Sequence, residues 1–285
     1  MLSAIRDRLG ADQAQLMQAL ALDPCDARLE TQLLMAAALG VNRAWLLAHG
    51  EEMLAPAAAA RYADLLERRL AGEPIAYIFG AKEFYGLMFK VSPAVLIPRP
   101  ETELLVELAL ARIAADRPCR VLDLGTGSGI IAVTLARLRP LAELVALDVS
   151  PAALALAQEN ARNLEASNVQ FIESDWFSAL GSVGKFDVIV SNPPYVSAGD
   201  PHLAHGDLRF EPPHALAAGP SGRSALARII AQAAPNMATA GTLLLEHGYD
   251  QGEYTRAALQ QAGFHQCVTY HDLAGVERVT LGTVG

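Results

Sequence analysis

Beyond residue 101, the chain alternates short apolar runs with segments in which apolar residues recur at helical spacing. The apolar runs have the length and the flanking turn residues that are typical of buried strands. They cover residues 119–124, 144–148, 169–172, 186–191 and 242–246. Strands that alternate with helices predict βαβ units, a mainly parallel sheet and helices on both of its faces.

The C-terminal end breaks this alternation. Two more strand-like runs, 264–271 and 277–281, are separated only by residues 272–276. This connection is too short for a crossover helix, so the last two strands should pair in antiparallel fashion.

The N-terminal part shows helical spacing and no strand pattern. Residues 27–39 and 57–70 are expected to be helices, with a short helix between them that contains Trp45. Asp26 and Asn42 are placed to cap the first and the short helix. We expect a small helical domain in which Trp45 anchors the core.

The pattern changes again between residues 73 and 100. Aromatic and β-branched residues cluster there, with Gly80 and Gly86 as turn points, which predicts a linking β-hairpin. The expected organisation is therefore a helical domain over 1–72, a hairpin linker over 73–100 and an α/β domain over 101–285.

The composition is that of a core-forming protein without a membrane span. Apolar residues make up 52% of the 285 residues, and no apolar run is long enough to cross a bilayer. Charged residues occupy the N-terminus, where a signal peptide would be apolar. Cys25, Cys119 and Cys267 are sparse and lack metal spacing, so we expect reduced core thiols and a cytoplasmic protein.

The net charge of −9 bears on the substrate. A protein that grips a nucleic-acid backbone usually presents a basic face, because each phosphate contact needs a cation. Lysine occurs only at positions 82, 90 and 185, and no basic run exceeds Arg68-Arg69. The balance favours a protein or small-molecule substrate.

A glycine-rich turn follows the strand at 119–124 and leads directly into a helical pattern. Such a turn lets the backbone approach a nucleotide-like cofactor closely. Asp148 ends the next strand, where a carboxylate that grips a ribose belongs. The predicted cofactor-binding residues of the turn are Gly125, Thr126, Gly127, Ser128 and Gly129. Nicotinamide enzymes and S-adenosylmethionine enzymes share these features.

Asp123 helps to choose between the two cofactors. An acid just before the glycines would repel a pyrophosphate, but it can accept hydrogen bonds from an ammonium group. S-adenosylmethionine carries an ammonium, a sulfonium and no phosphate, so this charge favours the methyl donor. Asp175 and Trp176 follow the third strand, where they could hold an adenine by its amino group and its ring.

Asn192-Pro193-Pro194-Tyr195 follows the strand at 186–191. The prolines fix two φ angles and remove two N–H donors, and Asn192 is held extended at the strand end. An amide, bare carbonyl oxygens and a phenol ring suit a planar NH₂-bearing group, although a plain proline turn would look the same. All these elements fall at the carboxyl ends of strands, the rim at which open α/β sheets bind ligands.

Together these motifs resemble the HemK/PrmC family. Beyond the glycine turn and the Asn-Pro-Pro-Tyr tetrapeptide, the resemblance extends to LIPRPETE (96–103), SDWF (174–177), RFEP (209–212) and ERVTLG (277–282). It implies a seven-stranded, Rossmann-like S-adenosylmethionine-dependent methyltransferase domain with a helical N-terminal domain. The family methylates the glutamine side-chain amide in the Gly-Gly-Gln loop of class 1 peptide chain release factors.

The resemblance also implies roles for residues. The Asn192 side-chain oxygen and the Pro193 carbonyl would each accept one N–H of the target amide, which makes these two the catalytic residues. Pro194 and Tyr195 complete the substrate site, and Tyr195 would pack over the amide plane. Asp148, Trp176 and Asn192 join the glycine turn in the cofactor site. The partners would be release factors docked on the helical domain, with no direct nucleic acid, membrane or metal.

Three rivals remain. A nucleic-acid amino methyltransferase would flip a base into the same pocket, a relic site would bind cofactor without turnover, and a nicotinamide dehydrogenase would leave Asn192–Tyr195 unexplained. Several other residues are expected to be bystanders. A metal site at Asp200, His202, His205 and Asp207 is not expected, and Glu246-His247 should be a plain strand end. Residues 97–99 are expected to line the methyl end of the pocket.

Overall fold

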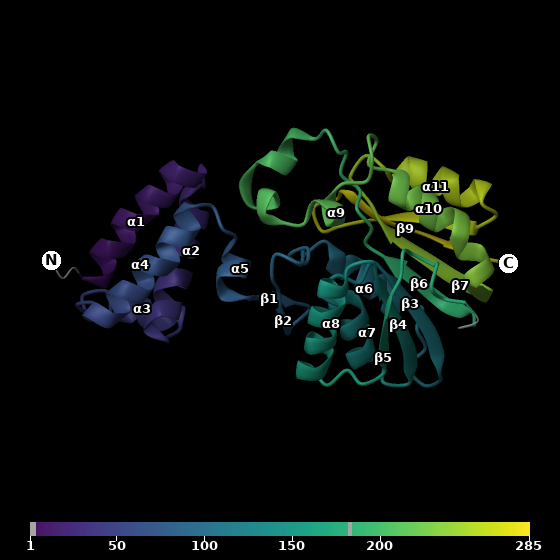
Figure 1. The fold of residues 1–285 in the computed structure, drawn as a ribbon, viewed down its shortest axis with the longest axis horizontal. Coiled ribbons are helices and arrows are strands. Elements are labelled where there is room, and N and C mark those ends of the chain that lie inside the picture. Colours follow the sequence, from purple (N-terminus) through teal and green to yellow (C-terminus); the bar gives the residue numbers. More distant parts are fainter. Residues whose placement is uncertain (1–3, 182–183) are drawn as a thin grey trace. The chain divides into compact units, whose positions relative to one another are not determined.

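A computed structural model describes residues 4–181 and 184–285 and divides them into two compact units (Figure 1). The first unit extends through Phe79 and also includes the segment Ala204–Phe210. The second comprises Gly80–Leu203 and Glu211–Gly285. Part of the first unit is thus inserted into the sequence of the second.

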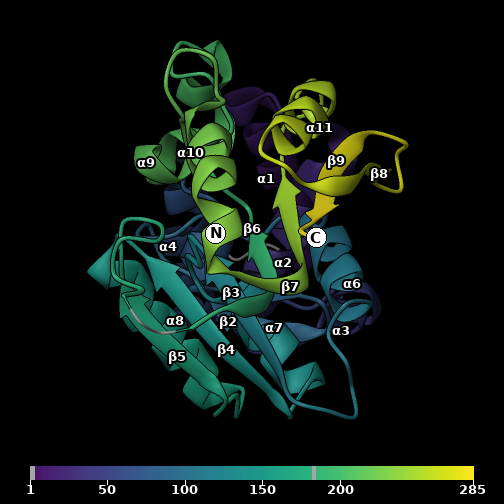
Figure 2. The ribbon, with the colours of Figure 1, turned by 90° about the vertical axis from the view of Figure 1, so that its right-hand side faces the viewer.

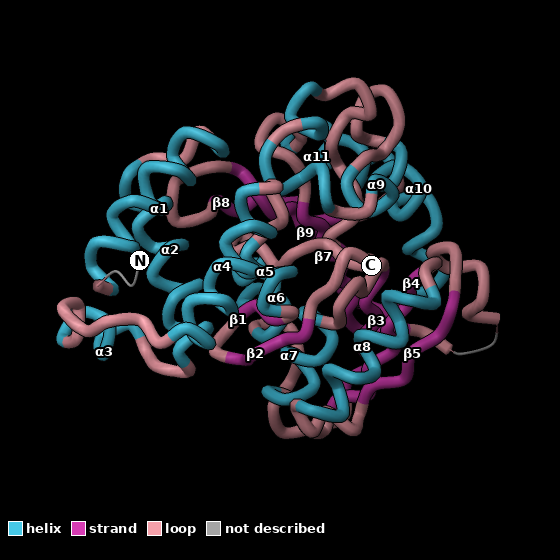
Figure 3. The backbone as a smooth tube through the Cα atoms, turned by 60° about the vertical axis from the view of Figure 1, so that its left-hand side comes forward, coloured by secondary structure: helices cyan, strands magenta, loops and turns pink. Residues whose placement is uncertain are grey.

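The first unit is helical, as the spacing predicts (Figure 3). Its core is built from fully buried side chains such as Leu16, Leu34 and Tyr62, with Trp45 half-buried against it and stacked on His49. The helices are α1 (Ile5–Leu20), α2 (Pro24–Leu39), α3 (Arg43–Ala48), α4 (Pro56–Leu70) and α5 (Ile75–Phe79), and the inserted segment contains the 3₁₀ turn η2 (Gly206–Phe210).

Two local predictions in this unit are wrong. Asp23, not Asp26, caps α2, because Pro24 favours the first helical position and the Asp23 carboxylate accepts the N–H groups of Cys25 and Asp26. Residues 75–79 are helical rather than part of a hairpin. The Pro74 carbonyl accepts the N–H groups of the third and fourth residues of this turn. The Asn42 cap is confirmed, because its side chain accepts the Trp45 N–H at 2.9 Å.

Arg69 holds the inserted segment in the first unit. Its side chain is only 4% exposed, and its guanidinium pairs with Glu30 at 2.8 Å and with Asp207 at 3.1 Å. The same group donates to the carbonyls of Gly72 and Glu73. Asp207 is therefore an anchor within this unit.

The second unit is built on a seven-stranded sheet with the order β5-β4-β3-β6-β7-β9-β8. β3 to β7 pair with one another in parallel, and β9 pairs in antiparallel fashion with both β7 and β8. The predicted runs and the antiparallel C-terminal pair are confirmed. The strands are β3 (Cys119–Leu124), β4 (Ala142–Asp148), β5 (Val169–Glu173), β6 (Phe186–Ser191), β7 (Met237–Glu246), β8 (His265–His271) and β9 (Glu277–Thr283).

Helices cover both faces of this sheet. On one face α6 (Thr102–Leu110), α7 (Ile130–Leu138) and α8 (Pro151–Asn163) pack in one apolar core with alternate strand residues. On the other face α10 (Ser224–Ala233) and α11 (Gly252–Gln261) form a second core and lie together near β7 (Figure 2). The expected doubly covered α/β fold is confirmed.

The linking hairpin belongs to the second unit. It consists of β1 (Ala81–Phe84) and β2 (Leu87–Lys90), and Phe84 and Phe89 are buried in the core on the α6–α8 face. The short elements η1 (Pro201–Ala204), α9 (Pro213–Leu216) and η3 (Ala234–Asn236) complete the chain.

The three cysteines have free thiols, but they do not share one environment. Cys119 is buried, Cys267 is half-buried and Cys25 is exposed, so the expectation of core thiols is wrong for Cys25, which lies at the start of α2. Across the described residues, no helix is both long and apolar enough to cross a membrane.

Candidate active site

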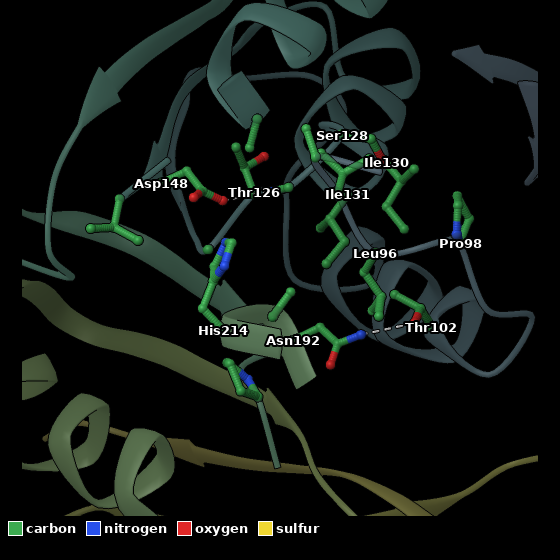
Figure 4. Close-up of a pocket in the computed structure, with 18 of the residues that line it drawn as sticks. Leu96, Pro98, Thr102, Thr126, Ser128, Ile130, Ile131, Asp148, Asn192 and His214 are labelled. Atoms are coloured by element: carbon green, nitrogen blue, oxygen red, sulfur yellow. Dashed lines mark hydrogen bonds between the residues drawn. The ribbon is translucent and has the colours of Figure 1, made fainter. Parts of the chain in front are cut away.

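A pocket opens at the carboxyl ends of the central strands of the second unit (Figure 4). Each lining segment follows a strand end or starts a helix, which is where an open α/β sheet places its ligand site. The residues that line it and enter the argument below are Leu96, Pro98, Arg99, Thr102, Gly125, Thr126, Gly127, Ser128, Asp148, Asp175, Trp176, Asn192, Pro194 and His214.

The glycine turn forms one wall of this pocket. The N–H groups of Gly125 and Thr126 both donate to the Leu147 carbonyl at 2.8 Å, which ties the turn to the end of β4. Gly125 has a φ of +73°, a conformation that favours glycine. Gly125 to Ser128 line the pocket. Gly129 does not line it; a Cβ atom there would lie 3.1 Å from the Ala157 Cβ atom on α8, so this glycine permits close helix packing.

Asp148 lies at the end of β4 and shapes the turn as well as lining the pocket. Its Oδ2 atom accepts the Gly127 N–H at 2.8 Å, and its Oδ1 atom accepts the Ser150 N–H at 2.9 Å. Each carboxylate oxygen has a further lone pair, so the group can still accept hydroxyl donors from a ligand.

Asp123 lies beneath the turn, fully buried, and does not line the pocket. The Thr126 hydroxyl donates to its Oδ2 atom at 2.6 Å, and among the described residues its Oδ1 atom has no partner. Burial raises the pKa of this carboxyl group to about 7, against the hydrogen bonds that lower it. Asp123 therefore adds a buried acid beneath the glycine turn without lining the pocket itself.

Asp175 and Trp176, which follow β5, also line the pocket. Trp176 has a φ of +53°, and a Cβ atom on Gly125 would lie 3.6 Å from the indole ring, so turn and ring are in close contact. The Asp175 carboxylate pairs with Arg228 at 2.6 Å and is half exposed. An indole and a carboxylate are thus brought to the same pocket as Asp148.

Asn192 directly follows β6 and lines the pocket together with the glycine turn, Asp148 and the segment that leads into α6. Its Nδ2 atom donates to the Thr102 hydroxyl at 3.1 Å, and its oxygen turns away from Thr102 (Figure 4). Pro194 lines the pocket, whereas Pro193 is buried and Tyr195 is half-buried, and neither lines it. The Tyr195 carbonyl accepts a hydrogen bond from Gln251 at 3.0 Å, which fixes the tetrapeptide.

Another part of the pocket wall comes from residues before α6 and from α9. Leu96, Pro98 and Arg99 line the pocket, but Ile97 does not. The Ile97 N–H donates to the buried Glu211 carboxylate at 3.0 Å, and Arg99 pairs with the same carboxylate. Glu211 therefore holds this wall in place. His214 on α9 also lines the pocket and points into it (Figure 4), a position that sequence reasoning missed.

Comparison with known proteins identifies the family. A family described as "Methyltransferase domain" matches residues 115–262, and "PrmC N-terminal domain" matches residues 7–80. The release factor glutamine methyltransferase of Bordetella pertussis is 49% identical over 267 residues, which cover 94% of this chain and 98% of that protein. The release factor glutamine methyltransferase of Escherichia coli K12 is 49% identical over 255 residues, which cover 90% of this chain and 91% of that protein. The chain belongs to the release factor glutamine methyltransferase family. The resemblance inferred from the motifs is confirmed.

Solved structures agree with the family on the fold. A methyltransferase from Pyrococcus furiosus superposes with a TM-score of 0.54 at 18% identity, covering 78% of this chain and 99% of that one. The 16S rRNA N2 G1207 methyltransferase of T. thermophilus gives 0.54 at 23% identity, covering 72% and 50%. At these identities the likeness concerns the fold alone, and it is that of the family's catalytic domain.

Some site-forming residues carried no strong signal in the sequence. Thr102 was part of an acidic helix start, yet its hydroxyl is the Asn192 partner. Glu246, expected to be a plain strand end, is fully buried at the end of β7, and this burial raises the pKa of its carboxyl group to about 7. Among the described residues, no three His, Cys, Asp or Glu side chains gather as a metal site. Asp200 instead accepts hydrogen bonds from the backbone and ring of His202.

Proposed function

We propose that the chain transfers a methyl group from S-adenosyl-L-methionine to the side-chain amide nitrogen of the glutamine in the Gly-Gly-Gln loop of class 1 release factors. The observation that carries this proposal is the orientation of Asn192. Its NH₂ group is engaged by Thr102, so its oxygen is left to accept an N–H from a planar amide. Family membership supports release factor glutamine as the target.

The charges of the pocket suit this cofactor. Two carboxylates, Asp148 and Asp175, line the wall at the glycine turn, and the buried Asp123 lies beneath it. Carboxylates favour a ligand that carries an ammonium and a sulfonium and disfavour one that carries a pyrophosphate. The Asp148 carboxylate would accept the ribose hydroxyls, and Trp176 would pack on the adenine. When bound, the cofactor supplies an electrophilic methyl group on sulfur.

The chain's own residues then have a positioning task. An amide nitrogen is a weak nucleophile because its lone pair is delocalised, so the nitrogen must be held about 3–3.5 Å from the methyl carbon and in line with it. The Asn192 Oδ1 atom and the Pro193 carbonyl would each accept one N–H of the glutamine. Two acceptors also favour the positive charge that builds on nitrogen, which then loses a proton to water.

The protein substrate needs more surface than this pocket offers. A stable protein–protein interface buries about 800 Å² on each partner. We infer that the helical unit supplies the further surface, and that the reaction takes place in the cytoplasm with release factor. The chain's net charge of −9 weighs against direct contact with a nucleic-acid backbone.

The experiment uses the full chain, S-adenosylmethionine labelled on its methyl group, and release factor. Label should enter wild-type release factor and should be absent when the loop glutamine is replaced by alanine. Label that persists in the replaced factor would refute the proposed target. A mobility-shift assay with RNA at low salt tests the alternative of a nucleic-acid methyltransferase. That alternative requires RNA binding that weakens steeply with added salt.

A further inference from the structure

Gln251 is a buried amide outside the pocket whose side chain is committed to the backbone that follows Asn192. It is 4% exposed and occupies the N-cap position of α11. Short polar residues are preferred at this position, because their side chains accept an N–H of the first helical turn. Within the part of the chain that the structure describes, the Gln251 side chain makes no such bond. A residue that departs from a local preference is expected to serve another purpose.

Three hydrogen bonds show where this side chain is used instead. Its Oε1 atom accepts the Gly248 N–H at 3.1 Å. Its Nε2 atom donates to the carbonyls of Tyr195 at 3.0 Å and of Gly222 at 3.3 Å. A backbone N–H only donates and a carbonyl only accepts, so these partners admit one of the two orientations of the amide. Gln251 therefore joins the tetrapeptide to two other backbone segments.

The peptide group between Tyr195 and Val196 is held at both of its ends. Its carbonyl accepts from Gln251, and its N–H, which belongs to Val196, donates to the Leu216 carbonyl at 3.0 Å. Gly222 packs against the same carbonyl: a Cβ atom there would lie 2.2 Å from the Tyr195 oxygen, and its φ of +68° favours glycine. Rotation of this peptide group would break at least one of these contacts.

Ser191 fixes the other end of the tetrapeptide. It pairs with Leu124 of β3 and with Leu245 of β7, and its hydroxyl donates to the Leu124 carbonyl at 2.7 Å. Between the two fixed ends, Pro193 and Pro194 have fixed φ angles, and each restricts the residue before it to extended conformations. The direction of the Pro193 carbonyl therefore depends on where the two ends are held.

We propose that Gln251 is a positioning residue for methyl transfer. By holding the Tyr195 carbonyl, against which Gly222 packs, it sets the direction in which the Pro193 carbonyl meets the target amide. This rests on the proposed function, in which that carbonyl accepts one N–H of the glutamine. Gln251 does not line the pocket, so it acts through the tetrapeptide without touching substrate or cofactor. A displacement of about 1 Å caused by a residue outside the chemistry can cost about a hundredfold in rate.

The first test is single-turnover methyl transfer by the full chain, with saturating cofactor and release factor. Q251M keeps the length of the side chain but removes its donors and its acceptor. Its transfer rate should fall at least about tenfold, with a cofactor dissociation constant within about twofold of the wild type. Q260M, at an exposed position of α11, is the control and should keep the wild-type rate. A wild-type rate in Q251M, or a cofactor affinity that falls as far as the rate, would overturn the proposal.

Q251E separates positioning from packing, because it keeps the shape of the side chain. Its carboxylate can accept the Gly248 N–H, but it faces two carbonyl oxygens without a hydrogen to donate. The protonated acid regains one donor, and burial favours the protonated form. The transfer rate of Q251E relative to the wild type should therefore rise at least about threefold from about pH 8 to about pH 6, while that of Q251M stays constant. A relative rate of Q251E that does not change with pH would count against the role of the Nε2 donor.

Gly222 provides an independent variant that acts on the same carbonyl. G222A would displace the Tyr195 oxygen, so its transfer rate should also fall at least about tenfold. Gly275, in the turn between β8 and β9, has a φ of +77°, and among the described residues nothing lies within 4 Å of a Cβ atom there. G275A thus carries a similar backbone strain and should keep the wild-type rate. Equal rates in the two variants would overturn the role of the Tyr195 carbonyl.

A second readout needs no substrate. The Val196 N–H belongs to the peptide group that Gln251 holds, so its hydrogen exchange in Q251M should accelerate at least about tenfold relative to that of Leu244 in β7, which reports opening of the sheet. Q260M should leave this ratio unchanged. An unchanged ratio in Q251M would overturn the proposal. Should release factor prove not to be the substrate, the exchange of Val196 still tests the role of Gln251, so the two failures are distinguishable.

Discussion

The Asn160 side chain on α8 joins Ser128 of the glycine turn to the hairpin strand β2. Its Nδ2 atom donates to the Ser128 carbonyl at 2.9 Å and to the Lys90 carbonyl at 3.0 Å, while its Oδ1 atom accepts the Lys90 N–H at 2.8 Å. Asn160 is 1% exposed, so water cannot replace these bonds. One amide thus ties the glycine-turn wall of the pocket to the hairpin.

Asn160→Ala should therefore cost both stability and cofactor affinity. It leaves the buried Ser128 carbonyl and the partly buried N–H and carbonyl of Lys90 without their Asn160 partner, a loss of about 2–3 kcal/mol in the free energy of unfolding of the second unit. Urea denaturation and cofactor titration measure the two effects. Asn163→Ala, at an exposed position of the same helix, is the control and should change neither. Equal stability and equal cofactor affinity in the two variants would contradict this role of Asn160.

Asp148→Ala should weaken cofactor binding by at least about tenfold. The substitution removes the acceptor proposed for the ribose and also frees the Gly127 N–H that the carboxylate holds. Isothermal titration with S-adenosylmethionine measures the change. Glu173, which pairs with Asp148 in the register of β4 and β5 but does not line the pocket, provides the control E173A. An unchanged dissociation constant for D148A would argue against ribose contact.

Asp123 should make the folded state less stable as the pH rises. Its pKa is raised from 3.8 to about 7, so between these values the folded state binds a proton that the unfolded state has lost. The free energy of unfolding contributed by this group is then highest below about pH 4, falls through the interval, and is constant above about pH 7. The full drop is at most about 4 kcal/mol.

Asp123→Asn isolates this contribution. The variant keeps an acceptor for Thr126 but cannot ionise, so the difference in unfolding free energy between variant and wild type should shift in favour of the variant from pH 4 to pH 8. Denaturant titrations at each pH, without cofactor, give this difference. A difference that stays constant with pH would show that Asp123 does not titrate in this range.

The parts of the fold that followed from sequence are those fixed by local pattern. The strand 186–191 and its carboxyl-end position follow from an apolar run bounded by turn residues, and the structure gives β6 the same bounds. Residues 75–79 did not follow, because a short apolar run fits a strand and a buried helical turn equally well. In the structure this segment is a helical turn, and the Pro74 carbonyl accepts two of its N–H groups.

The site could be predicted to the same extent and for the same reason. Asp148 and Asn192 lie at strand ends, which the pattern locates, and the structure places both in one pocket. The pairing of Thr102 with Asn192 depends on a contact between residues far apart in sequence, one on α6 and one after β6. Such contacts exist only in the folded sheet, so no local pattern could indicate them.

The central claim is that the Asn192 oxygen holds the target amide. Single-turnover methyl transfer to release factor, measured together with the cofactor dissociation constant, tests it most directly in the variant Asn192→Ala. The account predicts a loss of at least about a hundredfold in the transfer rate with cofactor affinity largely intact, because positioning is what the residue contributes. A transfer rate close to that of the wild type would contradict it.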